Sequence, residues 1–103
     1  MNFAYREVSQ NMAMNANDKI IGVDTTNNLV SVTLPAISSV RAGFVAIIKD
    51  VGNYASKSGQ RIYIWAKGDN TIDGLSAYVA IEINVNFASV SLVSDGVSKW
   101  HVY

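Results

Sequence analysis

SVSLVSDGVSKWHVY, residues 89–103, combines two alternating runs with a turn between them. Apolar residues recur at every second position of the two runs, at Val90, Leu92, Trp100 and Val102. A period of two is typical of β-strands that turn one face toward a core. Asp95-Gly96 separates the runs, and such pairs accept the positive φ of tight turns. We therefore predict two strands here, with Trp100 and Val102 filling the core from the last one.

The same alternation recurs along the chain and defines the fold class. Further strands are expected at residues 19–23, 29–34, 44–48, 61–65 and 79–85. Asn27-Asn28 predicts a hairpin between the first two of these strands. The only expected helical structure is a single turn within residues 35–41, because residues 11–18 contain helix formers but are too few for a stable helix. This pattern predicts an all-β protein, a small antiparallel β-sandwich or jelly roll of about seven or eight strands.

The N-terminal segment is set apart from the rest of the chain. We divide the single domain into an N-terminal strand or arm, residues 1–18, and a β-sandwich domain, residues 19–103. One interpretation makes residues 3–8 an edge strand that closes a sheet. The other makes the segment an arm that adds a strand to a neighbouring subunit. In that arm, pockets of the neighbour take Phe3 and Tyr5, and Met12 and Met14 adapt to an uneven surface.

Composition excludes several classes of protein. Eight basic residues balance eight acidic ones, which argues against an electrostatic nucleic-acid binder and against a polybasic membrane-surface protein. No cysteine is present, so disulfides and cysteine-based zinc sites are excluded. The first ten residues lack the basic and apolar regions of a secretory signal, and we expect a protein made in the cytoplasm without signal-directed export. A near-zero net charge favours association.

The candidate chemistry is sparse. His101 is the single histidine, no nucleophile motif occurs, and most aspartates lie at or near turns, where they are typical turn formers. Residues 69–74, DNTIDG, offer oxygen ligands but miss the spacing of a calcium loop. We therefore expect no enzyme activity, no cofactor and no metal.

Two aromatic residues stand out as binding candidates. Tyr63 and Trp65 alternate with Ile62 and Ile64, so the two pairs lie on opposite faces of one strand. If the isoleucines face the core, the aromatic pair forms a second buried layer, a subunit interface, or a platform on which sugars stack. Tyr54, in the polar loop 51–60, is a further candidate for glycan contact.

Several short motifs, in a fixed order, carry a resemblance to a known family. They are VTLPA (32–36), GFVAIIKD (43–50), IDG (72–74), SDG (94–96) and WHV (100–102). Together they resemble a small β domain of bacteriophage virion appendage proteins, which include tail fibres, head fibres and capsid decoration proteins. The resemblance covers about residues 19–103.

The resemblance implies a non-enzymatic structural protein of the virion, made in the bacterial host and commonly a homotrimer. The matched positions look like turn and core residues, so no catalytic role is carried over. Because only about eighteen residues precede the matched part, we expect a free-standing capsid decoration (cement) protein that binds neighbouring shell subunits. The alternative is a tail or head fibre module that recognises a host-surface glycan. The expected partners are further copies of the chain and a capsid or other virion protein, with no nucleic acid and no membrane.

Overall fold

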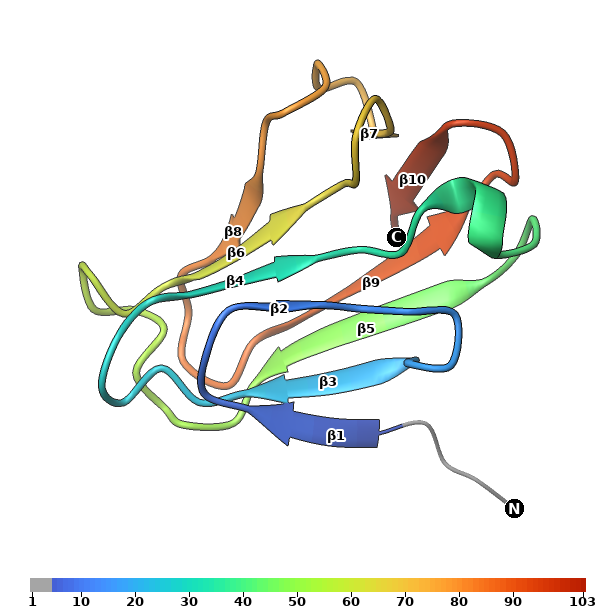
Figure 1. The fold of residues 1–103 in the computed structure, drawn as a ribbon. Coiled ribbons are helices and arrows are strands. Elements are labelled where there is room, and N and C mark those ends of the chain that lie inside the picture. Colours follow the sequence, from blue (N-terminus) through green and yellow to red (C-terminus); the bar gives the residue numbers. More distant parts are fainter. Residues whose placement is uncertain (1–4) are drawn as a thin grey trace.

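The computed structural model describes residues 5–103, which form two β-sheets (Figure 1). The six-stranded sheet A contains, in spatial order, β1 (Tyr5–Val8), β3 (Ile20–Val23), β5 (Val45–Asp50), β9 (Ser89–Ser94), β10 (Lys99–Val102) and β7 (Thr71–Ile72). The four-stranded sheet B contains β2 (Met12–Ala13), β4 (Val30–Thr33), β6 (Ile62–Trp65) and β8 (Ile81–Ile83). Within the described residues the helical structure is limited to the 3-10 turn η1 (Ile37–Ser39), and no helix there is long and apolar enough to cross a bilayer. The all-β prediction is confirmed.

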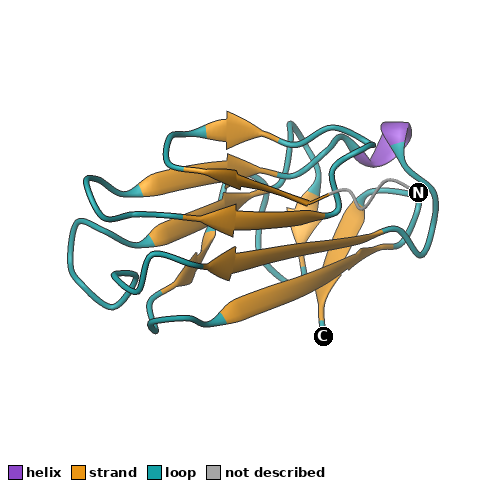
Figure 2. Cartoon of the chain, turned by 90° about the horizontal axis from the view of Figure 1, so that it is seen from below, coloured by secondary structure: helices purple, strands orange, loops and turns teal. Residues whose placement is uncertain are grey.

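Successive strands from β1 to β6 alternate between the two sheets. Up to β6, each strand that returns to a sheet runs in the same direction as the strand before it in that sheet, whereas β8 returns antiparallel to β6. As a result β1, β3 and β5 are parallel neighbours in sheet A, and β2, β4 and β6 are parallel neighbours in sheet B. Figure 2 shows the strands stacked in layers, with the loops that join them gathered at the strand ends.

The antiparallel arrangement expected from the sequence is therefore wrong for most strand pairs. Among residues 5–103 five pairings are parallel, and three, β5–β9, β9–β10 and β6–β8, are antiparallel. The predicted hairpin at Asn27-Asn28 is also wrong, because β3 lies in sheet A and β4 in sheet B. Neither asparagine has the positive φ that a two-residue hairpin turn requires. The side-chain amide of Gln60 instead donates to the carbonyls of Thr25 and Thr26. These bonds connect residues 24–29, where the chain passes from sheet A to sheet B, to the loop 51–60.

Most predicted strand positions agree with the structure, although strand lengths and number differ. The described chain has ten strands, and the two that were not expected, β2 and β7, have two residues each. The strand expected at 79–85 is only Ile81–Ile83, which leaves Val79 and Val85 43% and 60% exposed. The turn expected within residues 35–41 is η1.

The inward faces of the two sheets form a single hydrophobic core. Alternate residues of the central strands are completely buried, including Val30, Val32, Ile48, Ile62, Ile64 and Leu92. Trp100 is the largest of the fully buried side chains, and its ring meets the ring of Phe44 edge to face, with centroids 6.2 Å apart. The core position predicted for Trp100 is confirmed. The one predicted for Val102 is wrong, because β7 pairs only with Lys99 and Trp100 and leaves the end of β10 open, with Val102 40% exposed.

We predict that Trp100→Ala lowers the free energy of unfolding by about 3–5 kcal/mol, because it leaves a large cavity where two sheets and Phe44 meet. That loss is a large part of the roughly 5–15 kcal/mol typical of a domain. Urea unfolding followed by far-UV circular dichroism measures it. Val97→Ala, at a side chain that is 80% exposed, is the control and is expected to change stability by less than about 0.5 kcal/mol. Equal stability of the two variants would contradict this assignment of the core.

Candidate functional site

The aspartate of the IKD motif binds backbone groups rather than a ligand. Asp50 is completely buried at the end of β5. One of its carboxylate oxygens accepts the N–H of Gly52 at 3.1 Å, and the other accepts the N–H groups of Ala55 at 3.3 Å and Phe87 at 3.0 Å. These bonds fasten two loops to the end of one strand. They also satisfy a buried charge, which is costly unless it is hydrogen-bonded.

The SDG motif likewise forms a turn held by its aspartate. The Asp95 Oδ1 atom accepts the N–H groups of Val97, Ser98 and Lys99 at 2.8, 2.9 and 3.0 Å. These three donors lower the pKa of the Asp95 carboxyl group. Gly96 has a φ of +77°, and a Cβ atom there would lie 2.8 Å from the Cβ of Ala42, so the turn requires glycine both for its conformation and for its packing.

The polar side chains of residues 69–74, DNTIDG, also contact other parts of the protein. Asp73 accepts the N–H of Val102 at 3.0 Å and lies 3.8 Å from Nδ1 of His101, which is about half exposed. The Asn70 side chain accepts the N–H of Ile37 at 3.1 Å, and Asp69 accepts the hydroxyl of Tyr78 at 3.2 Å. Within residues 5–103 no group of three or more histidines or carboxylates gathers in the way a metal ion needs.

The outer face of sheet B carries the predicted aromatic pair. Ile62 and Ile64 are fully buried and Tyr63 and Trp65 are half-buried, so the predicted division of β6 into two faces is confirmed. Alternation places Arg61 on the same outer face as Tyr63 and Trp65, and we call these three residues the aromatic row.

The neighbours of the aromatic row are polar. Ser31 and Glu82 pair with Tyr63 on its two sides, and Thr33 pairs with Trp65. Arg61 lies 3.5 Å from a carboxylate oxygen of Glu82. This surface combines two aromatic rings with small hydroxyl groups and one ion pair. Such a surface can bind a polar ligand that contains a ring, or another protein.

Part of the outer face of sheet A is apolar. Register brings Ile20 beside Ile47 and Val45 beside Val93, and we call these four residues the apolar face. All four are partly exposed, with Ile20 the most exposed at 37%. Parallel sheets are usually covered on both sides, whereas no helix covers this side within the described chain (Figure 1).

The N-terminal candidates lie in different environments. Tyr5 is 46% exposed on the edge strand β1, where its hydroxyl donates to Glu7, and Met12 is half-buried on β2 at the edge of sheet B. Met14 is 5% exposed and belongs to the core, so packing rather than partner contact accounts for it. Phe3 lies outside the described residues.

Residues 5–18 are integrated into the fold. Arg6 donates two hydrogen bonds, each of 3.0 Å, to Asp18, and the segment contributes a strand to each sheet. An arm that includes all of these residues would therefore have to leave both sheets.

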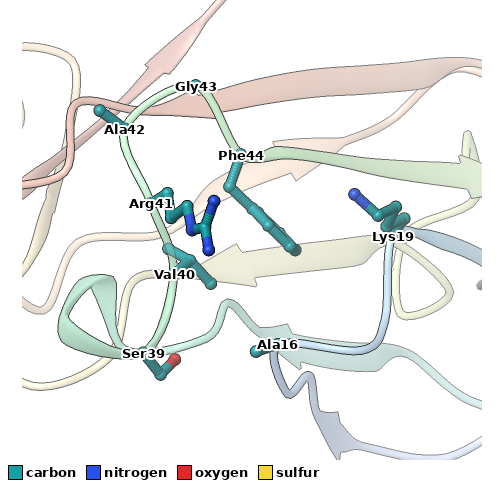
Figure 3. A pocket seen from close by; sticks show the side chains of 8 residues that line it. All are labelled: Ala16, Lys19, Ser39, Val40, Arg41, Ala42, Gly43 and Phe44. Atoms are coloured by element: carbon teal, nitrogen blue, oxygen red, sulfur yellow. The ribbon is translucent and has the colours of Figure 1, made fainter.

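A cavity of about 390 Å³ opens where β3 and β5 begin (Figure 3). It is lined by residues 39–44, from η1 to the start of β5, and by Ala16 and Lys19, which lie between β2 and β3. Lys19 and Arg41 could not be recognised as candidates from the sequence, because the two residues belong to separate loops and share no motif.

Comparison of the sequence with models of known protein families and with curated proteins finds no match. The resemblance to phage appendage domains consequently rests on the order and spacing of the quoted motifs. The structure adds what these residues do, since Asp50, Asp73 and Asp95 all accept backbone hydrogen bonds.

We predict that Asp95→Asn destabilises the protein at about pH 7 and that this difference shrinks in acid. The folded-state pKa of Asp95 is lowered from 3.8, so its carboxylate contributes stability above that value and loses it as pH falls through the folded-state pKa. Urea unfolding of both proteins over an acid pH series measures the difference. Asp69→Asn, which removes a carboxylate that among the described residues accepts only the Tyr78 hydroxyl, is the control. A pH-independent difference for Asp95→Asn would contradict the role assigned to the three N–H donors.

Proposed function

We propose that this chain is a structural protein of a bacteriophage particle, a capsid decoration (cement) protein that binds neighbouring shell subunits. The proposal is supported by the structural role of the motif residues. Asp50, Asp73 and Asp95 are all engaged by backbone N–H groups, and Trp100 fills the core. The motif positions on which the resemblance to virion appendage domains rests thus maintain a scaffold. The faces of that scaffold then remain for binding other proteins.

The proposed architecture within the virion is a homotrimer. The apolar face supports self-association, because Ile20, Val45, Ile47 and Val93 form a continuous apolar area on an uncovered sheet face. A net charge of zero lowers the repulsion between copies. The number three comes from the family resemblance. We further propose that the two sheets act as the layers of a β-sandwich; their parallel pairings separate it from a jelly roll, whose strands are antiparallel.

A second function is favoured by the aromatic row. Tyr63 and Trp65 lie side by side on one strand face, next to Ser31 and Thr33. Rings with neighbouring hydroxyl groups suit a neutral sugar, which would make the protein a tail or head fibre module that recognises a host-surface glycan. Tyr54, half-buried beneath the Lys57 ammonium, is less accessible for stacking.

Electron microscopy of the virion distinguishes the two functions. For a decoration protein, we expect density of this chain repeated over the shell, at contacts between capsid subunits. Density confined to a tail tip or a head fibre would replace the decoration role with the fibre role. Absence of the chain from purified particles would overturn both.

We predict that the protein is a trimer in solution, with a mass three times the 11.1 kDa of the chain, and that Ile47→Asp dissociates it. The substitution buries a carboxylate at the centre of the apolar face, which is unfavourable without a partner. Light scattering measures the mass, and circular dichroism verifies that the variant is folded. Val97→Asp, which adds the same charge at an exposed turn, is the control and remains a trimer. A folded Ile47→Asp trimer excludes this face as the interface, and a monomeric parent protein contradicts self-association itself.

We also predict, for the glycan-recognition function, that Trp65→Ala weakens binding of host cells about fivefold or more, because stacking on an aromatic ring contributes roughly 1–3 kcal/mol for nucleic-acid bases and a sugar ring stacks in a similar way. Binding of labelled protein to host cells measures this effect. Val97→Ala is again the control. Unchanged binding by Trp65→Ala would remove the aromatic row as a glycan site.

A further inference from the structure

In the part of the chain that the structure describes, the two cations of the cavity have no anionic partner. Within residues 5–103, the side chains of Lys19 and Arg41 take part in no salt bridge and no side-chain hydrogen bond. The acidic neighbour of Lys19 in sequence, Asp18, is engaged elsewhere, by Arg6 and by the N–H of Asn15. Two positive charges that share one cavity favour an anion there, because its attraction to both adds up.

The walls of the cavity are held by backbone contacts on both sides. The Lys19 carbonyl accepts the N–H of Ile47 at 2.8 Å, and the N–H of Gly43 donates to the carbonyl of Ser94 at 2.8 Å. Ala42 packs against Gly96 so closely that no Cβ fits there. The Phe44 ring rests on the buried Trp100. The cavity is therefore largely formed before any ligand arrives, which reduces the entropic cost of binding.

The positions of the charges limit the shape of the ligand. Figure 3 shows the side chains of Arg41 and Lys19 extending toward Phe44 from opposite sides, and the Lys19 ammonium lies 5.0 Å from the centroid of that ring. A ligand that reaches both cations must span the ring. Val40 and Phe44 supply apolar lining between the cations, and Ser39 adds a hydroxyl group. Carboxylate is a preferred partner of a guanidinium group, with which it forms two parallel hydrogen bonds.

We propose that this cavity binds a carboxylated sugar, a single uronic acid unit. Its carboxylate pairs with Arg41, and its ring oxygen and hydroxyl groups accept hydrogen bonds from Lys19. Its hydroxyl groups also exchange hydrogen bonds with Ser39, and the C–H face of its ring covers Val40 and Phe44. Inorganic phosphate has no apolar surface that could pack against Val40 and Phe44. Acetate has no ring to cover Val40 and Phe44. The cavity volume of about 390 Å³ falls within the usual range of small-molecule sites. The proposal is independent of the virion role and of the aromatic row.

Titration of ¹⁵N-labelled protein with glucuronate, followed by NMR, tests the proposal. We expect amide shifts concentrated at residues 16–19 and 39–44. Methyl glucoside has the ring without the carboxylate, acetate has the carboxylate without the ring, and both are expected to bind at least about tenfold more weakly. Arg41→Gln and Lys19→Gln are each expected to weaken glucuronate binding by about tenfold. Lys57→Gln removes a lysine that also lies over an aromatic ring, but in another loop, and leaves binding unchanged.

Several results would overturn the proposal. Equal binding of methyl glucoside would exclude carboxylate recognition, and equal binding of acetate or phosphate would exclude ring recognition. A short peptide rich in aspartate and glutamate that binds more tightly than glucuronate would reassign the cavity to a protein partner. An undiminished affinity of Arg41→Gln for glucuronate, with an unchanged fold, would place the binding site elsewhere.

Discussion

The pairing of β5 (Val45–Asp50) on both of its edges is the constraint on which the rest of the structure depends. On one edge it is parallel to β3, and on the other it is antiparallel to β9, so the direction of sheet A reverses there. Phe44 at its start rests on Trp100, and Asp50 at its end binds two loops through backbone N–H groups. Within sheet A, this strand thus joins the parallel strands β1 and β3 to the C-terminal strands β9 and β10.

The period-two pattern predicted most strands but not their partners, and the reason is physical. Alternation reports only which side of a strand is buried, and Ile62 and Ile64 would be buried equally well by parallel or antiparallel neighbours. Direction is decided by where the chain goes after each strand. At residues 24–29 it crosses to the other sheet, and the side chains that hold this crossing include Gln60, which is remote in sequence. A short turn motif such as Asn27-Asn28 does not contain that information.

The two candidate sites also differ in whether the sequence could predict them. The aromatic row could be predicted, because Tyr63 and Trp65 alternate with core residues on one strand. The cavity could not, because Lys19 and Arg41 meet only after β3 and β5 pair. Composition does not reveal the cavity either, because the engagement of Asp18 by Arg6 is seen only in the folded structure.

The cavity and the apolar face share a border, since Lys19 directly precedes Ile20. The Lys19 carbonyl is bonded to the N–H of Ile47, a central residue of that face. A ligand that binds Lys19 and a second copy of the chain that covers Ile20 would therefore act on the same two backbone segments. If each changes the affinity for the other, linkage requires the two effects to be equal in free energy. The β3–β5 pairing is thus the physical connection through which assembly and ligand binding would influence each other in this small fold.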